Sequence, residues 1–91
     1  MIFMDLFIDA LLFAYFNGDF SVLGENFCRL VSEIYDQSDD VTKKVVDFRY
    51  SGGSYKDVPS KLFISTSCYY FRLGNFVKKV KDRKNCASFD V

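Results

Sequence analysis

The sequence contains no histidine, only one proline and only three cysteines. The absence of histidine excludes the commonest general base, the Ser–His and Cys–His nucleophile pairs and most transition-metal sites. The cysteines are widely spaced, form no CxxC pair and cannot all pair within one chain. We therefore expect free thiols in the reducing cytoplasm, with no zinc site, no other metal and no cofactor.

Sequence motifs for catalysis are also missing. Gly52-Gly53 is not followed by the Lys-Ser or Lys-Thr of a phosphate-binding loop. Asp5 and Asp9, one helical turn apart, could form a catalytic carboxylate pair, but the sequence indicates no cleft to hold a substrate. We expect that the protein is not an enzyme.

The formal net charge is zero, but the charges are unevenly distributed along the chain. Residues 1–47 contain nine acidic and three basic residues, which gives −6, whereas residues 48–91 contain three acidic and nine basic residues, which gives +6. If folding keeps the two halves apart, the protein is strongly dipolar. If the halves pack against each other, their surface charges mix.

Apolar residues make up 49% of the 91-residue chain, enough for one hydrophobic core. The first sixteen residues, MIFMDLFIDALLFAYF, lack the basic segment and cleavage site of a signal peptide, and Asp5 and Asp9 interrupt them. We expect a buried first helix and no membrane anchor. The prediction is one domain over residues 1–91, with residues 1–84 as its core and residues 85–91 as a frayed tail.

Hydrophobic spacing in the first half predicts two helices that form an antiparallel hairpin. Residues 2–16 lack glycine and proline, and Gly18 can end this helix in a left-handed conformation. Asp19 or Ser21 can cap the second helix, which is expected over about 20–37. The apolar stripe of the second helix has the spacing i, i+4, i+7, i+8 and i+11, and consists of Leu23, Phe27, Leu30, Val31 and Ile34.

The second half of the chain has a less regular pattern. Residues 38–50 begin with a candidate cap at Ser38 and favour a short helix, although the alternation over 46–50 also fits a strand. Residues 60–83 predict a further helix, irregular near Ser65–Ser67 or Gly74. The fold is predicted to be all-α, a small antiparallel bundle of about four helices; the alternative is α+β with a hairpin around residues 45–71.

The acidic residues form the candidate surface for a protein partner. An anionic surface attracts a basic partner, accelerates association and can cover a site that binds phosphates. If the first helix packs through its most apolar side, Asp5 and Asp9 project beside the outer face of the second. Tyr15, Tyr35 and Tyr50 are candidate exposed aromatic anchors. The predicted partner-binding set is Asp5, Asp9, Glu25, Glu33, Tyr35, Asp36, Asp39 and Asp40.

A second hypothesis is a nucleic-acid-binding module. The stretch VKKVKDRKN places five cations within residues 78–84, which could contact phosphates. The aromatic run at residues 69–71 could stack on bases. Against this hypothesis, the total charge is zero and no nucleic-acid-binding motif frames these residues.

Residues 11–35, LLFAYFNGDFSVLGENFCRLVSEIY, resemble the opening of the small helical immunity proteins that protect bacteria from colicin D. The shared features are a leucine-rich helix, a short turn, an apolar-Ser/Thr step at Phe20-Ser21 and an aromatic-rich amphipathic helix. The family usually places an acidic-aromatic pair about four residues after the step, where this chain has Gly24-Glu25-Asn26-Phe27.

The resemblance implies a four-helix bundle that binds and blocks a cognate toxin, often a ribonuclease, through acidic residues. Immunity proteins of contact-dependent inhibition are a neighbouring possibility. The functional expectation is therefore an immunity-type inhibitor of a bacterial toxin nuclease. The alternative is a phage- or virus-encoded inhibitor of host machinery, which would also block its target through an acidic surface but would have a different target.

Overall fold

The structure is a computed structural model that describes residues 6–88 and the side chains of residues 6–84. The described residues form helices and loops without a strand, which confirms the all-α prediction. None of these helices is both long and apolar enough to cross a bilayer. The elements are α1 (Leu6–Phe16), α2 (Glu25–Gln37), α3 (Asp40–Tyr50), the 3-10 helix η1 (Tyr55–Asp57), α4 (Val58–Leu62) and α5 (Thr66–Ser88).

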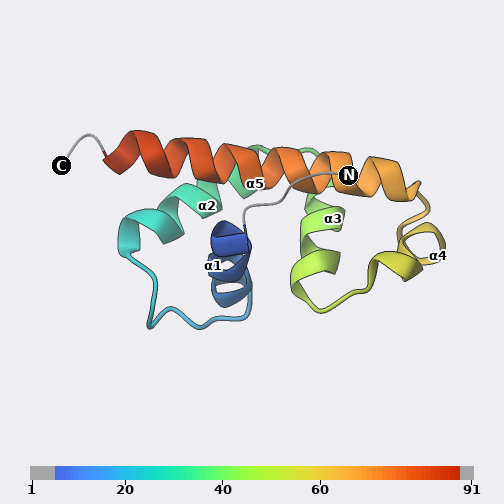
Figure 1. The fold of residues 1–91 in the computed structure, drawn as a ribbon, viewed down its shortest axis with the longest axis horizontal. Coiled ribbons are helices and arrows are strands. Elements are labelled where there is room, and N and C mark those ends of the chain that lie inside the picture. The colour runs from blue at the N-terminus through green and yellow to red at the C-terminus, as the bar shows by residue number, and fades with distance from the viewer. Residues whose placement is uncertain (1–5, 89–91) are drawn as a thin grey trace.

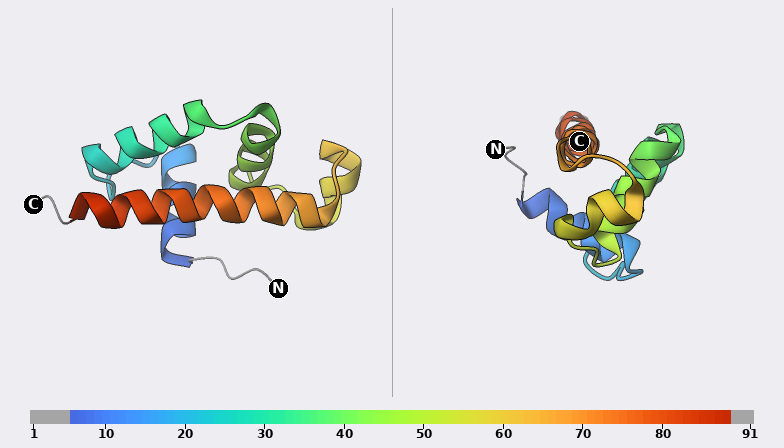
Figure 2. Two further views of the ribbon diagram at one scale, coloured as in Figure 1. Left: turned by 90° about the horizontal axis from the view of Figure 1, so that it is seen from above. Right: turned by 90° about the vertical axis from the view of Figure 1, so that its right-hand side faces the viewer.

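The longest helix, α5, forms the spine of the molecule, and α1 to α4 all lie on one side of it (Figure 1). In Figure 2, α2 follows the C-terminal half of α5, whereas α1 crosses α5 at a steep angle. The core lies where these helices meet α5, and it includes the α5 residues expected from helical spacing. The buried apolar side chains are Ile8, Leu12, Val31, Ile34, Val45, Val46, Tyr50, Val58, Tyr69, Leu73, Phe76, Val77 and Val80.

The predicted hairpin of the first two helices is wrong, because α1 packs mainly on α3 and α5 and not along α2. The second helix also begins at Glu25 and not near residue 20. Gly18 ends α1 with φ of 79°, in the left-handed conformation expected for it. Asp19 does not cap a helix, because its carboxylate accepts a hydrogen bond from the Ser21 hydroxyl at 2.7 Å within the loop. Residues 17–24 therefore form an irregular connection that lets α1 point away from α2.

The partner of α1 is α3, not α2. The Asn17 side-chain amide donates to the backbone oxygen of Tyr50 at 3.1 Å and to that of Phe13 at 2.8 Å. The Phe13 ring meets the Tyr50 ring edge-on, with centroids 4.9 Å apart, and the Phe16 ring stacks on Tyr50 at 5.3 Å. These contacts tie the C-terminal end of α1 to the C-terminal end of α3, so α1 packs against α3 and α5.

Residues 40–50 are helical, and the strand alternative is wrong. The N-cap of α3 is Asp39 and not Ser38, since the Asp39 carboxylate accepts a hydrogen bond from the Thr42 amide at 2.8 Å. Val45 and Val46 are adjacent in sequence and both fully buried, because α3 is packed by α1 on one flank and by α5 on another. This double burial explains why a helix carries a pattern that resembles a strand.

The predicted helix over 60–83 is two helices. α4 ends at Leu62, and Phe63 adopts a left-handed backbone conformation with φ of 58°. A new helix then starts at Thr66, where the Ser65 hydroxyl accepts a hydrogen bond from the Cys68 amide at 3.1 Å. α5 continues to Ser88, four residues into the segment expected to fray; residues 89–91 lie outside the described residues.

Candidate protein-binding surface

Asp9, expected on the surface, is buried with 6% of its area exposed. Its carboxylate accepts hydrogen bonds from the Tyr50 hydroxyl at 2.8 Å and from Arg49 Nη2 at 2.8 Å. Because α1 packs on α3, Asp9 joins the two helices and does not project beside α2. Asp5, the other member of the expected carboxylate pair, lies outside the described residues.

The Tyr50 ring, expected as an exposed anchor, is only 2% exposed. Burial, and then the hydrogen bond to Asp9, raise the pKa of the Tyr50 hydroxyl well above its usual value. Arg49 Nε is also buried, and no hydrogen-bond partner for it lies among the described residues. Asp9 and Tyr50 therefore belong to the packing between α1 and α3. Asp9 is withdrawn from the predicted binding set, and Tyr50 is withdrawn as a candidate anchor.

Besides Asp9, three of the predicted acidic residues form ion pairs with arginine. Arg29 Nη2 lies 3.1 Å from the Glu25 carboxylate, one turn along α2. Arg83 Nη2 lies 3.0 Å from the Glu33 carboxylate and links α5 to α2. Such exposed pairs contribute about 0–1 kcal/mol each, but they neutralise the field of the acid.

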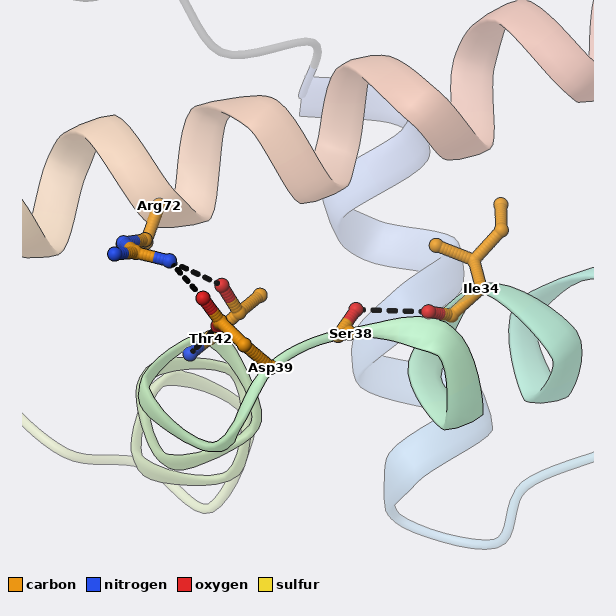
Figure 3. A network of polar contacts seen from close by, with 5 residues as sticks. All are labelled: Ile34, Ser38, Asp39, Thr42 and Arg72. Carbon is orange, nitrogen blue, oxygen red and sulfur yellow. Dashed lines mark hydrogen bonds and ion pairs between the residues drawn. The ribbon is translucent and has the colours of Figure 1, made fainter.

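The third pair, Arg72 with Asp39, belongs to a network at the corner between α2 and α3 (Figure 3). Asp39 caps α3 through Thr42, and Arg72 of α5 donates to both Asp39 and the Thr42 hydroxyl. Ser38 donates to the backbone oxygen of Ile34 at 2.7 Å and closes the end of α2. The hydrogen bonds from Thr42 and then Arg72 lower the pKa of Asp39 to about 2.

The two oppositely charged halves of the chain therefore meet where α5 lies against α2 and α3. Arg72 and Arg83 lie on the basic half and pair with acids from the other half. The predicted dipole is reduced along this line of contact, because the halves pack together and their charges mix.

Further acidic residues near the junction of α2 and α3 have no arginine partner among the described residues. Asp36 and Asp40 are exposed, and Asp40 and Asp47 lie seven residues apart on α3, on one face of the helix. Tyr35 is half-buried, and its hydroxyl donates to both carboxylate oxygens of Asp47, at 2.9 and 3.0 Å. We call Tyr35, Asp36, Asp40 and Asp47 the acidic corner.

Within the acidic corner, Tyr35 contacts both the cation of Lys43 and the carboxylate of Asp47. Lys43 Nζ lies 5.6 Å from the centroid of the Tyr35 ring, a cation–π contact. Burial, and then the hydrogen bond with Asp47, raise the pKa of Tyr35 to about 12. Tyr35 is therefore a neutral hydrogen-bond donor near pH 7, held in one orientation by its carboxylate neighbour.

Of the predicted residues, Tyr35, Asp36, Asp39 and Asp40 come together at the end of α2 and the start of α3. Glu25 lies at the opposite end of α2. Asp47 was not in the predicted set, although the order Asp40, Lys43, Asp47 at i, i+3 and i+7 places it on the same helix face as Asp40. Arg72 and Arg83 could not be found this way, because their partners are 33 and 50 residues away in sequence.

The basic segment of the nucleic-acid hypothesis is partly engaged. Arg83 pairs with Glu33, and Lys84 Nζ lies 5.6 Å from the centroid of the Phe7 ring. The aromatic run at 69–71 does not form a stacking platform, because Tyr69 is 1% exposed and only Phe71 is well exposed, at 62%. The geometry therefore gives this hypothesis little support.

Among the described side chains, those of residues 6–84, no group of three or more Cys, Asp or Glu is placed to hold a metal ion. Cys28 and Cys68 are free, partly exposed thiols. Comparisons of the chain with protein-family models, with curated proteins and with solved structures gave no match. No relative therefore tests the resemblance of residues 11–35 to immunity proteins, which stays a prediction.

Proposed function

We propose that this protein acts in the cytoplasm by binding and blocking a basic site on another protein, as an immunity-type inhibitor of a toxin nuclease. The observation that carries the proposal is the acidic corner. Asp36 and Asp40 are exposed carboxylates with no arginine partner among the described residues, and Asp36 lies beside the ordered Tyr35. The proposal assigns no reaction to the chain itself.

The physical basis is electrostatic complementarity with a nuclease groove. A site that binds nucleic acid is lined by cations, and carboxylates presented on a rigid scaffold can occupy the positions of phosphates. The acidic corner is rigid, because α2 and α3 both pack on α5 and Asp39 caps α3 at the junction. The ordered Tyr35 supplies a ring and a hydroxyl, which are common anchors in interfaces.

The structure also limits which acids take part. Glu25, Glu33 and Asp39 are partly neutralised by arginine, so their field is weaker than sequence alone suggests. The proposed contact surface is therefore the acidic corner, and not the whole acidic half of the chain.

The test compares two variants with the same change in net charge. The Asp36→Lys/Asp40→Lys variant reverses the acidic corner, and the Asp19→Lys/Asp57→Lys variant reverses two exposed acids elsewhere. The first step is to read the neighbouring genes, and the probe is the C-terminal nuclease domain of a toxin found there; neighbouring genes without a nuclease toxin count against the proposal. Association with the first variant should be slower by about tenfold or more at low salt, and the difference should shrink at high salt.

Two further results count against the proposal. One is equal slowing by both variants, because the effect would then come from net charge and not from the acidic corner. The other is tight, salt-sensitive binding of the protein to RNA or DNA in a gel-shift assay, which would favour the nucleic-acid hypothesis. Circular dichroism of both variants checks that the helices are unchanged.

A further inference from the structure

A small pocket lies where the C-terminal ends of α1 and α3 meet. Its volume is about 280 Å³, and its lining residues are Phe16, Asn17, Asp47, Tyr50 and Ser51. Sites that hold drug-sized ligands measure roughly 300–1,000 Å³, so this pocket suits a smaller group, such as the end of one side chain. We call these five residues and the space between them the helix-end pocket.

The polar groups of the helix-end pocket have already used their hydrogen-bond donors inside the protein. The Asn17 amide nitrogen donates to two backbone oxygens, at 2.8 and 3.1 Å. The Ser51 hydroxyl donates to a backbone oxygen of α3 at 3.1 Å, and the Tyr50 hydroxyl donates to Asp9 at 2.8 Å. The backbone N–H groups of Asn17 and Ser51 bond to the preceding turn, and the other lining N–H groups lie within helices. Among the described groups of this lining, no donor is left for a ligand.

The groups that the helix-end pocket offers to a ligand are hydrogen-bond acceptors. Because the Asn17 nitrogen is held by two backbone oxygens, the orientation of the amide is fixed, and no described residue donates to its oxygen Oδ1. The Asp47 carboxylate accepts from the Tyr35 hydroxyl at 2.9 and 3.0 Å, and an ionised carboxylate has about four acceptor sites, so it can accept further bonds. A ligand for this pocket must therefore be rich in donors.

The electrostatic field of the helix-end pocket favours a cation. Asp47 is exposed, and no described lysine or arginine forms an ion pair with it. Phe16 and Tyr50 are the last residues of α1 and α3, so the negative ends of two helix dipoles, each equivalent to roughly half a charge, lie at the pocket. The five lining residues include no lysine or arginine, and Lys43, one turn before Asp47, lies over the Tyr35 ring.

Among cations, a guanidinium group matches the helix-end pocket best. It carries five N–H donors and no acceptor, which fits a lining of acceptors. Its planar and weakly hydrated face packs well on an aromatic ring, and the half-buried ring of Phe16 lines the pocket. A metal ion fits less well, because Asp47 is the only carboxylate of the five lining residues.

We propose that the helix-end pocket receives an arginine side chain of the basic partner protein. The proposal rests on the proposed function, since it names the group of that partner which meets Asp47. Asp47 belongs to both the acidic corner and the pocket, so it connects the surface that attracts the partner to the pocket that fixes the partner in place. Asp36 and Asp40 do not line the pocket, which allows the two proposals to be tested separately.

The first test uses a small arginine analogue and needs no partner protein. The probe is N-acetyl-arginine methylamide, whose only charge is the guanidinium, and the readout is the set of backbone amide shifts in ¹H–¹⁵N NMR spectra of the full chain. We expect saturable shifts centred on Asn17, Asp47 and Ser51, with the weak affinity of a ligand this small. The matching lysine analogue should bind more weakly, and the uncharged citrulline analogue should give no saturable shift.

Two variants with the same loss of charge locate the site. Asp47→Asn removes the carboxylate of the pocket and should weaken binding of the arginine analogue by about tenfold or more, because a charged hydrogen bond is lost. Asp36→Asn makes the same change in the acidic corner but outside the pocket, and it should change this affinity by less than about twofold. Circular dichroism and thermal unfolding check that both variants fold as the wild-type protein does.

The closing measurement uses the toxin nuclease domain as the partner. Asp47→Asn should accelerate dissociation of the complex by about tenfold or more, whereas Asp36→Asn should act mainly on the association rate. An unchanged dissociation rate for Asp47→Asn overturns the partner's arginine as the occupant.

Three results with the analogues overturn the pocket itself and leave the acidic corner intact. They are the absence of saturable shifts, equal binding of the lysine or citrulline analogue, and unchanged affinity in Asp47→Asn. Failure of the proposed function looks different. The arginine analogue then binds in the pocket, but Asp36→Lys/Asp40→Lys associates with the nuclease as fast as the wild-type protein, which overturns the toxin nuclease as the source of the arginine.

Discussion

The buried carboxylate of Asp9 offers the sharpest test of how α1 is held in place. Replacing Asp9 with alanine leaves the Tyr50 hydroxyl and the Arg49 guanidinium without their shared acceptor. An unpaired buried hydroxyl costs about 1–3 kcal/mol, and loss of a charged hydrogen bond about 1.5–3 kcal/mol. The Arg49 side chain is 31% exposed, so water recovers part of the second cost.

We therefore expect Asp9→Ala to lower the free energy of unfolding by about 3 kcal/mol. In a domain of this size, that corresponds to a fall in Tm of roughly 12–24 °C. The measurement is urea unfolding at neutral pH, followed by far-ultraviolet circular dichroism. The free energy should fall at an unchanged denaturant slope, since the same surface is exposed on unfolding.

A double-mutant cycle with Tyr50→Phe separates the hydrogen bond from general loss of packing. Tyr50→Phe keeps the ring, which is 2% exposed, and removes only the hydroxyl. Its cost should be about 1–2 kcal/mol in the wild-type chain and close to zero in the Asp9→Ala chain. A loss below about 1 kcal/mol for Asp9→Ala, or additive costs in the cycle, would refute the account of Asp9 as the link between α1 and α3.

Two other sites give predictions that need only the isolated protein. A methyl group at Gly53 would lie 2.6 Å from the Phe48 ring. Gly53→Ala should therefore lower the free energy of unfolding by about 1–3 kcal/mol, measured by thermal unfolding. Unchanged stability would mean that the Phe48 ring can move aside without cost. The pKa of Asp39 is lowered from 3.8 to about 2 by Thr42 and Arg72, so its stabilising effect is present above pH 3.8 and is lost as the pH falls toward 2. Urea unfolding of wild type and Asp39→Ala should therefore differ above pH 4 and converge near pH 2; a constant difference across this range would contradict the assignment.

Helical spacing located the helices better than it located their ends. The stripe Leu73, Phe76 and Val80 is buried as expected, because apolar side chains three or four residues apart lie on one helix face. The start of α2 was missed, and an irregularity was expected near Ser65–Ser67 or Gly74, whereas the chain breaks fully into two helices at residues 63–65. No proline or glycine marks the break, and a phenylalanine in the left-handed conformation contradicts the usual signal for a helix end.

The candidate surface was only partly readable from the sequence. The acids near the junction of α2 and α3 lie close together in the chain, so local spacing brought Asp36, Asp39 and Asp40 together. Local spacing could not show that Asp9 is buried, because its partners Arg49 and Tyr50 lie about forty residues further along the chain. The distinction between a surface acid and a structural acid depended on which helix α1 packs against.

The sequence alone favoured a small all-α fold, because the helical period of its apolar residues leaves a single face to bury on most segments. It also determined the uneven distribution of charge along the chain. Only the tertiary structure decided how those charges meet, because Arg72 and Arg83 reach their carboxylates through the packing of α5 on α2 and α3. Ion pairs between distant residues leave no pattern in the sequence, because they depend on where the helices lie. The positions of the helices are set by the burial of apolar surface, which is non-directional.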